Sequence, residues 1–137
     1  MKGKINIAAG FIVMGLFMLY GFFLIYLRDF APGKEEWAAS YPTGKHFEAR
    51  LAHVHGNLFA FLNIVIGYLL TRFGSDLCCS KGISGLALAG MLMPLGILTE
   101  VYLGFPPFFV LVGAVSMTVS VFLMGWGFIR MKKQTAD

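Results

Sequence analysis

The chain has 137 residues, of which 58% are hydrophobic and 13% are charged. Such an apolar composition excludes an ordinary water-soluble domain and indicates an integral membrane protein. The formal net charge of +4 comes from basic residues scattered at the ends of apolar runs, without the basic stripe that is typical of nucleic-acid binding. The lipid bilayer is therefore an expected partner, and nucleic acid is not.

Four apolar runs follow one another along the chain, and each is long enough to cross a hydrocarbon core of roughly 30 Å as a helix. The predicted membrane helices are about 5–27, 48–70, 83–103 and 107–129. Residues 28–47 are predicted to be a loop, because they hold proline, glycine and several charges. Pro94 predicts a kink in the third helix. We expect one all-α domain over 1–137, a four-transmembrane-helix bundle.

The basic residues near the span ends predict the orientation of the bundle, because cytoplasmic loops carry an excess of lysine and arginine. One side collects Lys2, Lys4, Arg72, Lys81, Arg130, Lys132 and Lys133. The other side has Arg28, Lys34, Lys45 and Arg50, offset by Asp29, Glu35, Glu36 and Glu48. We therefore expect both termini in the cytoplasm, in a multi-pass protein of the inner or plasma membrane of a prokaryote. Cys78 and Cys79 lack a second ligand pair, so no metal site is expected there.

The second predicted helix carries an unusual number of polar residues. His46, Arg50, His53 and Asn57 follow one another at spacings of four, three and four residues, so they share one face of a helix. A charged side chain at the centre of a membrane helix costs about 2.5–3.5 kcal/mol on insertion scales. We expect this polar stripe to face the interior of the bundle.

His55 points away from that stripe. It lies about 200° around the helix from His53, so the two imidazoles cannot readily bind one ion together. Gly56, with Ala49 and Ala52 before it, forms a strip of small residues along which another helix or a flat macrocycle such as haem can approach closely. The alternative for both histidines is a purely structural hydrogen bond between helices.

Apart from Glu48 at the very start of the second span, Glu100 is the one acidic residue inside a predicted span, and it should lie at the depth of Arg50. A buried carboxylate needs a nearby cation, so we expect an ion pair between Arg50 and Glu100. Tyr102 would complete a polar pocket in the outer half of the bundle. The inner half offers Asn63, Tyr20 and a few hydroxyl groups, which disfavours a complete proton relay.

The segment from Ala52 to Phe59, AHVHGNLF, resembles transmembrane helices that carry haem, such as those of the haem-copper oxidases. In size and layout the chain resembles the styrene oxide isomerase family of small four-helix membrane proteins. Ala49-Arg50 precedes Ala52-His53 and Gly56 follows, in the order of that family but not at its spacing. The resemblance implies haem b on a helix-two histidine, with iron acting as a Lewis acid on an epoxide. It also implies catalytic roles for Tyr102 and for Asn57 or Asn63.

The sequence therefore predicts a homo-oligomeric protein that binds haem b and acts on a hydrophobic small molecule, with His55 or His53 as the iron ligand. His55 is favoured, because the small-residue strip beside it offers room that the interior of so small a bundle lacks. Gly56 and Arg50 would contact the cofactor, with Glu100 behind them. The alternative is a cofactor-free interaction subunit or a small transporter-like bundle.

Overall fold

The computed structural model describes residues 3–131 of the chain. Its helices are α1 (Lys4–Asp29), α2 (Lys34–Ala39), α3 (Lys45–Phe73), α4 (Ser80–Gly90), α5 (Leu92–Leu103) and α6 (Phe108–Arg130). Four stretches are long and apolar enough to cross a membrane, namely Lys4–Asp29, Lys45–Phe73, Ser80–Leu103 and Phe108–Arg130. The predicted all-α bundle of four transmembrane helices is confirmed.

The structure adds a short helix to the predicted loop and shows where the third membrane helix breaks. The predicted loop 28–47 contains the short helix α2, which begins after Gly33 in a left-handed conformation, at a φ of 80°. The third membrane helix is interrupted at Met91, where α4 ends and α5 begins. Pro94 explains this break, because proline has no N–H group and its ring collides with the carbonyl of Gly90, four residues earlier. The Met91 N–H instead donates to the Leu88 carbonyl at 3.1 Å.

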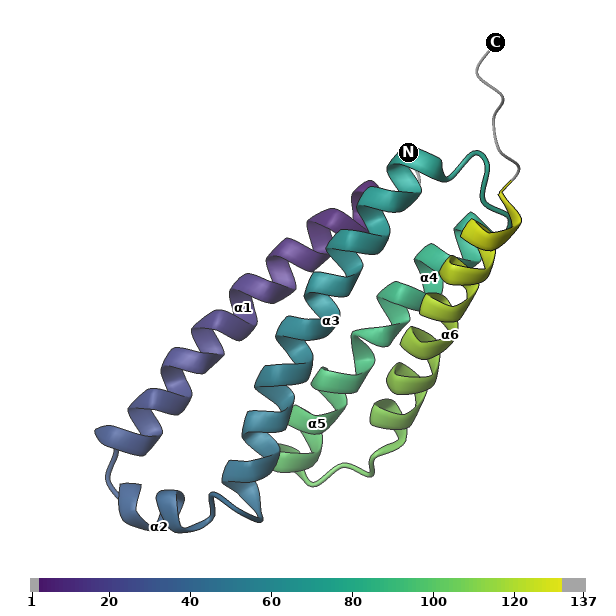
Figure 1. Cartoon of the computed structure of the whole chain (residues 1–137). Helices are drawn as coiled ribbons and strands as arrows, with labels where there is room; N and C mark the ends of the chain where they lie inside the picture. The colour runs from purple at the N-terminus through teal and green to yellow at the C-terminus, as the bar shows by residue number, and fades with distance from the viewer. Residues whose placement is uncertain (1–2, 132–137) are drawn as a thin grey trace.

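The four membrane spans are arranged in a row (Figure 1). Helix α1 packs mainly on α3, α3 also packs on α4 and α5, and α6 packs on α4 and α5. In the most apolar stretch of each span, the buried share is 17% in α1 and 22% in α6. The corresponding share is 33% in α3 and 39% in α4–α5. The two edge helices therefore leave broad apolar faces for lipid or for a second copy.

A polar network joins the spans in the half of the bundle that holds the start of α1. Asn6 of α1 donates through Nδ2 to Oδ1 of Asn63 in α3 at 2.9 Å and to the Ser84 carbonyl in α4 at 3.0 Å. Asn63 donates through its own Nδ2 to the Ala87 carbonyl at 2.8 Å. Ser120 of α6 donates to a carbonyl of α4 at 2.9 Å. The side chains of Asn6, Asn63 and Ser120 are fully buried, so these bonds fix the relative heights of all four spans.

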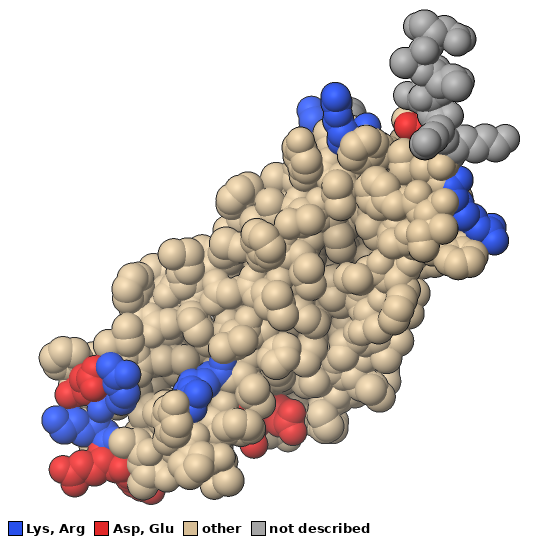
Figure 2. Space-filling view, in the orientation of Figure 1, with Lys and Arg blue, Asp and Glu red and all other residues tan. Residues whose placement is uncertain are grey.

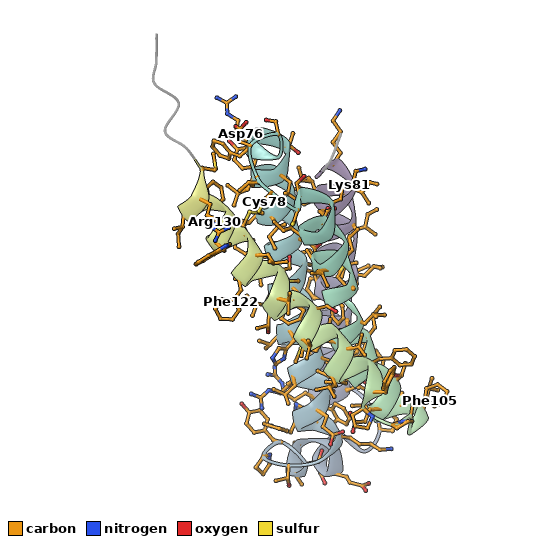
Figure 3. All side chains as sticks on the ribbon, turned by 90° about the vertical axis from the view of Figure 1, so that its right-hand side faces the viewer. Asp76, Cys78, Lys81, Phe105, Phe122 and Arg130 are labelled. Carbon is orange, nitrogen blue, oxygen red and sulfur yellow. The ribbon has the colours of Figure 1, made fainter. Side chains whose placement is uncertain are left out.

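The charged side chains gather toward the two ends of the bundle and leave an uncharged belt between them (Figure 2). Asp76, Cys78, Lys81 and Arg130 lie at one end, and Phe105 lies toward the other (Figure 3). The start of α1 is at the first end and α2 is at the second (Figure 1). The basic residues predicted on one side that the structure describes, Lys4, Arg72, Lys81 and Arg130, lie at one end of the bundle. Lys2, Lys132 and Lys133 are outside the described residues.

Candidate functional site

The residues of the predicted polar stripe of α3 contact different partners. His46 is 4% exposed and stacks on Trp37 of α2, with ring centroids 4.8 Å apart. Its Nδ1 lies 3.0 Å from the Trp37 carbonyl, and because a carbonyl only accepts, this nitrogen carries the proton. The Tyr41 ring packs on the same imidazole at nearly a right angle, with centroids 5.2 Å apart. His46 therefore anchors α2 to the start of α3.

Arg50 lies over an aromatic ring instead of pairing with an acid. Its guanidinium carbon is 3.8 Å from the centroid of the Tyr41 ring, which is a cation–π contact. Among residues 3–131 the only ion pair joins Arg28 and Asp29, so the predicted pair between Arg50 and Glu100 is wrong. Arg50 does not pair with Glu100 because the segment around α2 brings the Tyr41 ring to its guanidinium. Glu100 is half-buried on α5.

His53 holds α1 against α3. Its Nδ1 donates to the Phe17 carbonyl of α1 at 2.9 Å. The imidazole rests on Gly21 so closely that a Cβ built on this glycine would lie 2.6 Å from Cε1 of His53. Asn57 donates through Nδ2 to the His53 carbonyl at 2.9 Å within α3. Nδ1 of His53 and Nδ2 of Asn57 are therefore bonded within the fold, whereas Nε2 of His53 has no hydrogen-bond partner among residues 3–131 and lies against Gly21.

His55 has one nitrogen engaged and one free. Its Nδ1 donates to the Leu51 carbonyl of the preceding turn at 2.9 Å. Its Nε2 has no hydrogen-bond partner in the described part of the chain, and it is not enclosed by protein. On the outward face of α3, Val54 and Leu58 are 57% and 48% exposed. The middle of α3 is near residue 59, which places His55 roughly 6 Å from mid-span at 1.5 Å per residue.

The small-residue strip of α3 is used for helix packing. Ala49 and Ala52 are fully buried, and Ala52 packs in a cluster with Ile97 and Val101 of α5. A Cβ added to Gly56 would lie 2.4 Å from the ring of Phe17. Of the two uses that such a strip allows, the structure shows the approach of other helices. A macrocycle on His55 would therefore have to lie on the outward side of that residue.

Tyr102 has a partner that sequence reasoning missed. Its hydroxyl is 3.0 Å from the hydroxyl of Tyr20 in α1, and the Tyr20 ring centroid is 6.4 Å from that of His53. The expected position of Tyr20 in the inner half of the bundle is wrong. Tyr20 lies past the midpoint of Lys4–Asp29. Because this helix starts at the inner side, that position already indicates the outer half of the bundle. His53, Tyr20 and Tyr102 together form a polar group where α1, α3 and α5 meet.

Asn63 is far from that group. It bonds to the carbonyl of Ala87, and Ala87 and Tyr102 are fifteen residues apart along α4 and α5, which corresponds to roughly 22 Å. The predicted site residues therefore occupy three places: His55 on the outer face, His53 with Asn57 and the tyrosines against α1, and Asn63 in the inner polar network. The structure does not bring them into one pocket.

Within residues 3–131, no three His, Cys, Asp or Glu side chains gather into a set that could hold a metal ion. A metal bound at a single histidine of this chain would need its remaining ligands from elsewhere, and a haem macrocycle supplies four nitrogens of its own. No protein-family model, curated protein or solved structure matches the chain.

Proposed function

We propose that this small multi-pass membrane protein binds haem b through Nε2 of His55, as a homo-oligomer with both termini on the cytoplasmic side. The observation that carries the proposal is a half-satisfied imidazole near mid-span, with Nδ1 bonded to the Leu51 carbonyl and Nε2 free on the outer face of α3. A free acceptor nitrogen facing lipid is unfavourable unless a partner covers it.

The environment of His55 suits an iron ligand. A hydrogen bond from Nδ1–H to a carbonyl fixes the ring orientation and leaves the Nε2 lone pair for the metal, as is usual for metal-bound histidine. Leu58, three residues further along the helix, is 48% exposed, and its apolar side chain can line one face of a macrocycle. His53 is less suited, because its ring is covered by α1 at Gly21.

The finer part of the proposal is a Lewis-acid isomerase that acts on a hydrophobic epoxide, and it rests on the resemblance described above. Ferric haem would supply Lewis acidity toward the epoxide oxygen. Tyr102 is 47% exposed, so part of its side chain can be reached from the bilayer, and its hydroxyl bonds to that of Tyr20. Asn57 is half-buried beside His53, and Asn63 is enclosed in the inner network. Tyr102 is therefore the most accessible of the three predicted catalytic residues, although it lies with Tyr20 and His53 and not beside His55.

An absorption spectrum of the full chain, expressed with ample haem supply and purified in detergent, tests the proposal. We expect a Soret band that His55→Ala removes while the protein stays folded. His53→Ala is the matched control: we expect it to keep the band and to lower stability, because it removes the bond to α1. A protein bleached by His53→Ala but not by His55→Ala would place the haem against α1.

A second candidate function is a cofactor-free subunit that packs against other membrane helices. It is favoured by the observation that Ala49, Ala52 and Gly56 are all covered by neighbouring helices, which is the ordinary use of such residues. In that case the purified protein is colourless. The free Nε2 of His55 would then accept a hydrogen bond from a partner helix, and His55→Ala would weaken assembly.

A further inference from the structure

The end of the bundle that carries α2 contains an open cavity of about 430 Å³. It lies between the last turn of α1, the helix α2 and the first residue of α3. Leu27, Ala31 and Pro32 make part of its wall apolar, and Trp37 contributes an indole ring. The membrane helix α1 ends beside this cavity and the membrane helix α3 begins beside it. We therefore place the cavity at the depth of the lipid headgroups, where tryptophan is commonly found.

Three polar groups around this cavity lack partners within the described residues. Glu36 and Lys45 both line it, yet their side chains form no ion pair or hydrogen bond with each other or with another residue in 3–131. The indole Nε1 of Trp37 is buried without an acceptor. An unpaired buried donor is costly. The side chains of Glu36 and Lys45 are exposed, so a ligand that carries both a cation and an anion could pair with the two of them.

We propose that this cavity binds the headgroup of a phospholipid with phosphoethanolamine, its phosphate at Lys45 and its ammonium at Glu36. The charge complementarity selects this headgroup, because phosphocholine has no N–H to donate to a carboxylate and phosphatidylglycerol has no cation. The apolar wall accommodates the glycerol and the upper acyl chains. This site lies at the α2 end of the bundle and does not depend on whether His55 binds haem.

Quenching of Trp37 by brominated lipids tests the proposal on the full chain. The protein has two tryptophans, so Trp126→Phe leaves Trp37 as the sole indole fluorophore. The variant is reconstituted in phosphatidylcholine vesicles that contain a small fraction of lipid brominated in the upper acyl chain. The brominated lipid is phosphatidylethanolamine, phosphatidylcholine or diacylglycerol. A difference in quenching between phosphatidylethanolamine and phosphatidylcholine reports recognition of the ammonium. A difference between phosphatidylcholine and diacylglycerol reports recognition of the phosphate.

We expect phosphatidylethanolamine to quench Trp37 with a relative association constant about threefold to fivefold above that of phosphatidylcholine, the size expected of exposed ion pairs. Glu36→Gln should abolish this preference, and Lys45→Gln should abolish the preference of phosphatidylcholine over diacylglycerol. The matched controls Glu35→Gln and Lys34→Gln change neighbouring charges outside the cavity and should leave both preferences intact. Equal quenching by both phospholipids, or an equal effect of the control variants, would overturn the proposal.

Discussion

Replacing Asn63 by alanine tests whether the inner polar network holds the bundle together. Asn63 makes two bonds to other spans, one accepted from Asn6 at 2.9 Å and one donated to the Ala87 carbonyl at 2.8 Å. Hydrogen bonds between membrane helices contribute about 0.6 kcal/mol on average and about 1.7 kcal/mol at most. Asn63→Ala should therefore lower the free energy of unfolding by roughly 1–3 kcal/mol. Part of the network survives, because Asn6 keeps its bond to the Ser84 carbonyl.

The assay is reversible unfolding of the detergent-solubilised protein, followed by circular dichroism as a denaturing detergent is titrated. Asn57→Ala is the matched control: it removes the same side chain from the same helix, but Asn57 bonds mainly to the His53 carbonyl within α3. We expect that control to stay within about 0.5 kcal/mol of the parent. A double-mutant cycle of Asn6→Ala with Asn63→Ala should give a coupling of about 0.6–1.7 kcal/mol. Equal losses for the two single asparagine variants of α3, with no coupling to Asn6, would refute the structural role of Asn63.

Three further predictions use the same purified protein or its expression host. Gly56→Val should destabilise the fold by about 1–3 kcal/mol in thermal unfolding, because its side chain would collide with Phe17, whereas Gly15→Val, with open space around it, should change little. A double-mutant cycle of Tyr20→Phe with Tyr102→Phe should give a coupling of about 0.6 kcal/mol if their hydroxyls bond as described, and additive losses would argue against it. Reporters fused to either terminus should both be active in the cytoplasm, and one terminus found outside would contradict the orientation.

The class of protein and the number of spans could be predicted from sequence, because both follow from local properties. An apolar run of about 20 residues must cross the bilayer as a helix, whatever it packs against. The break before Pro94 is local in the same sense, because it arises from a missing N–H group and a collision four residues away. The common face of His46, Arg50, His53 and Asn57 follows from helical spacing alone.

The partners of those residues depended on the tertiary structure. Spacing places Arg50 on one face of α3 with His53, but the position of Tyr41 beside it comes from the fold of the segment around α2. In the same way, a strip of small residues allows the close approach of either a flat ligand or a neighbouring helix. In the structure Phe17 of α1 covers Gly56, so at that residue the strip packs against a helix. Helical spacing alone sets which side chains share a face. Only the packing of distant segments decided which partner each face meets, because those partners are brought together by contacts far apart in the chain.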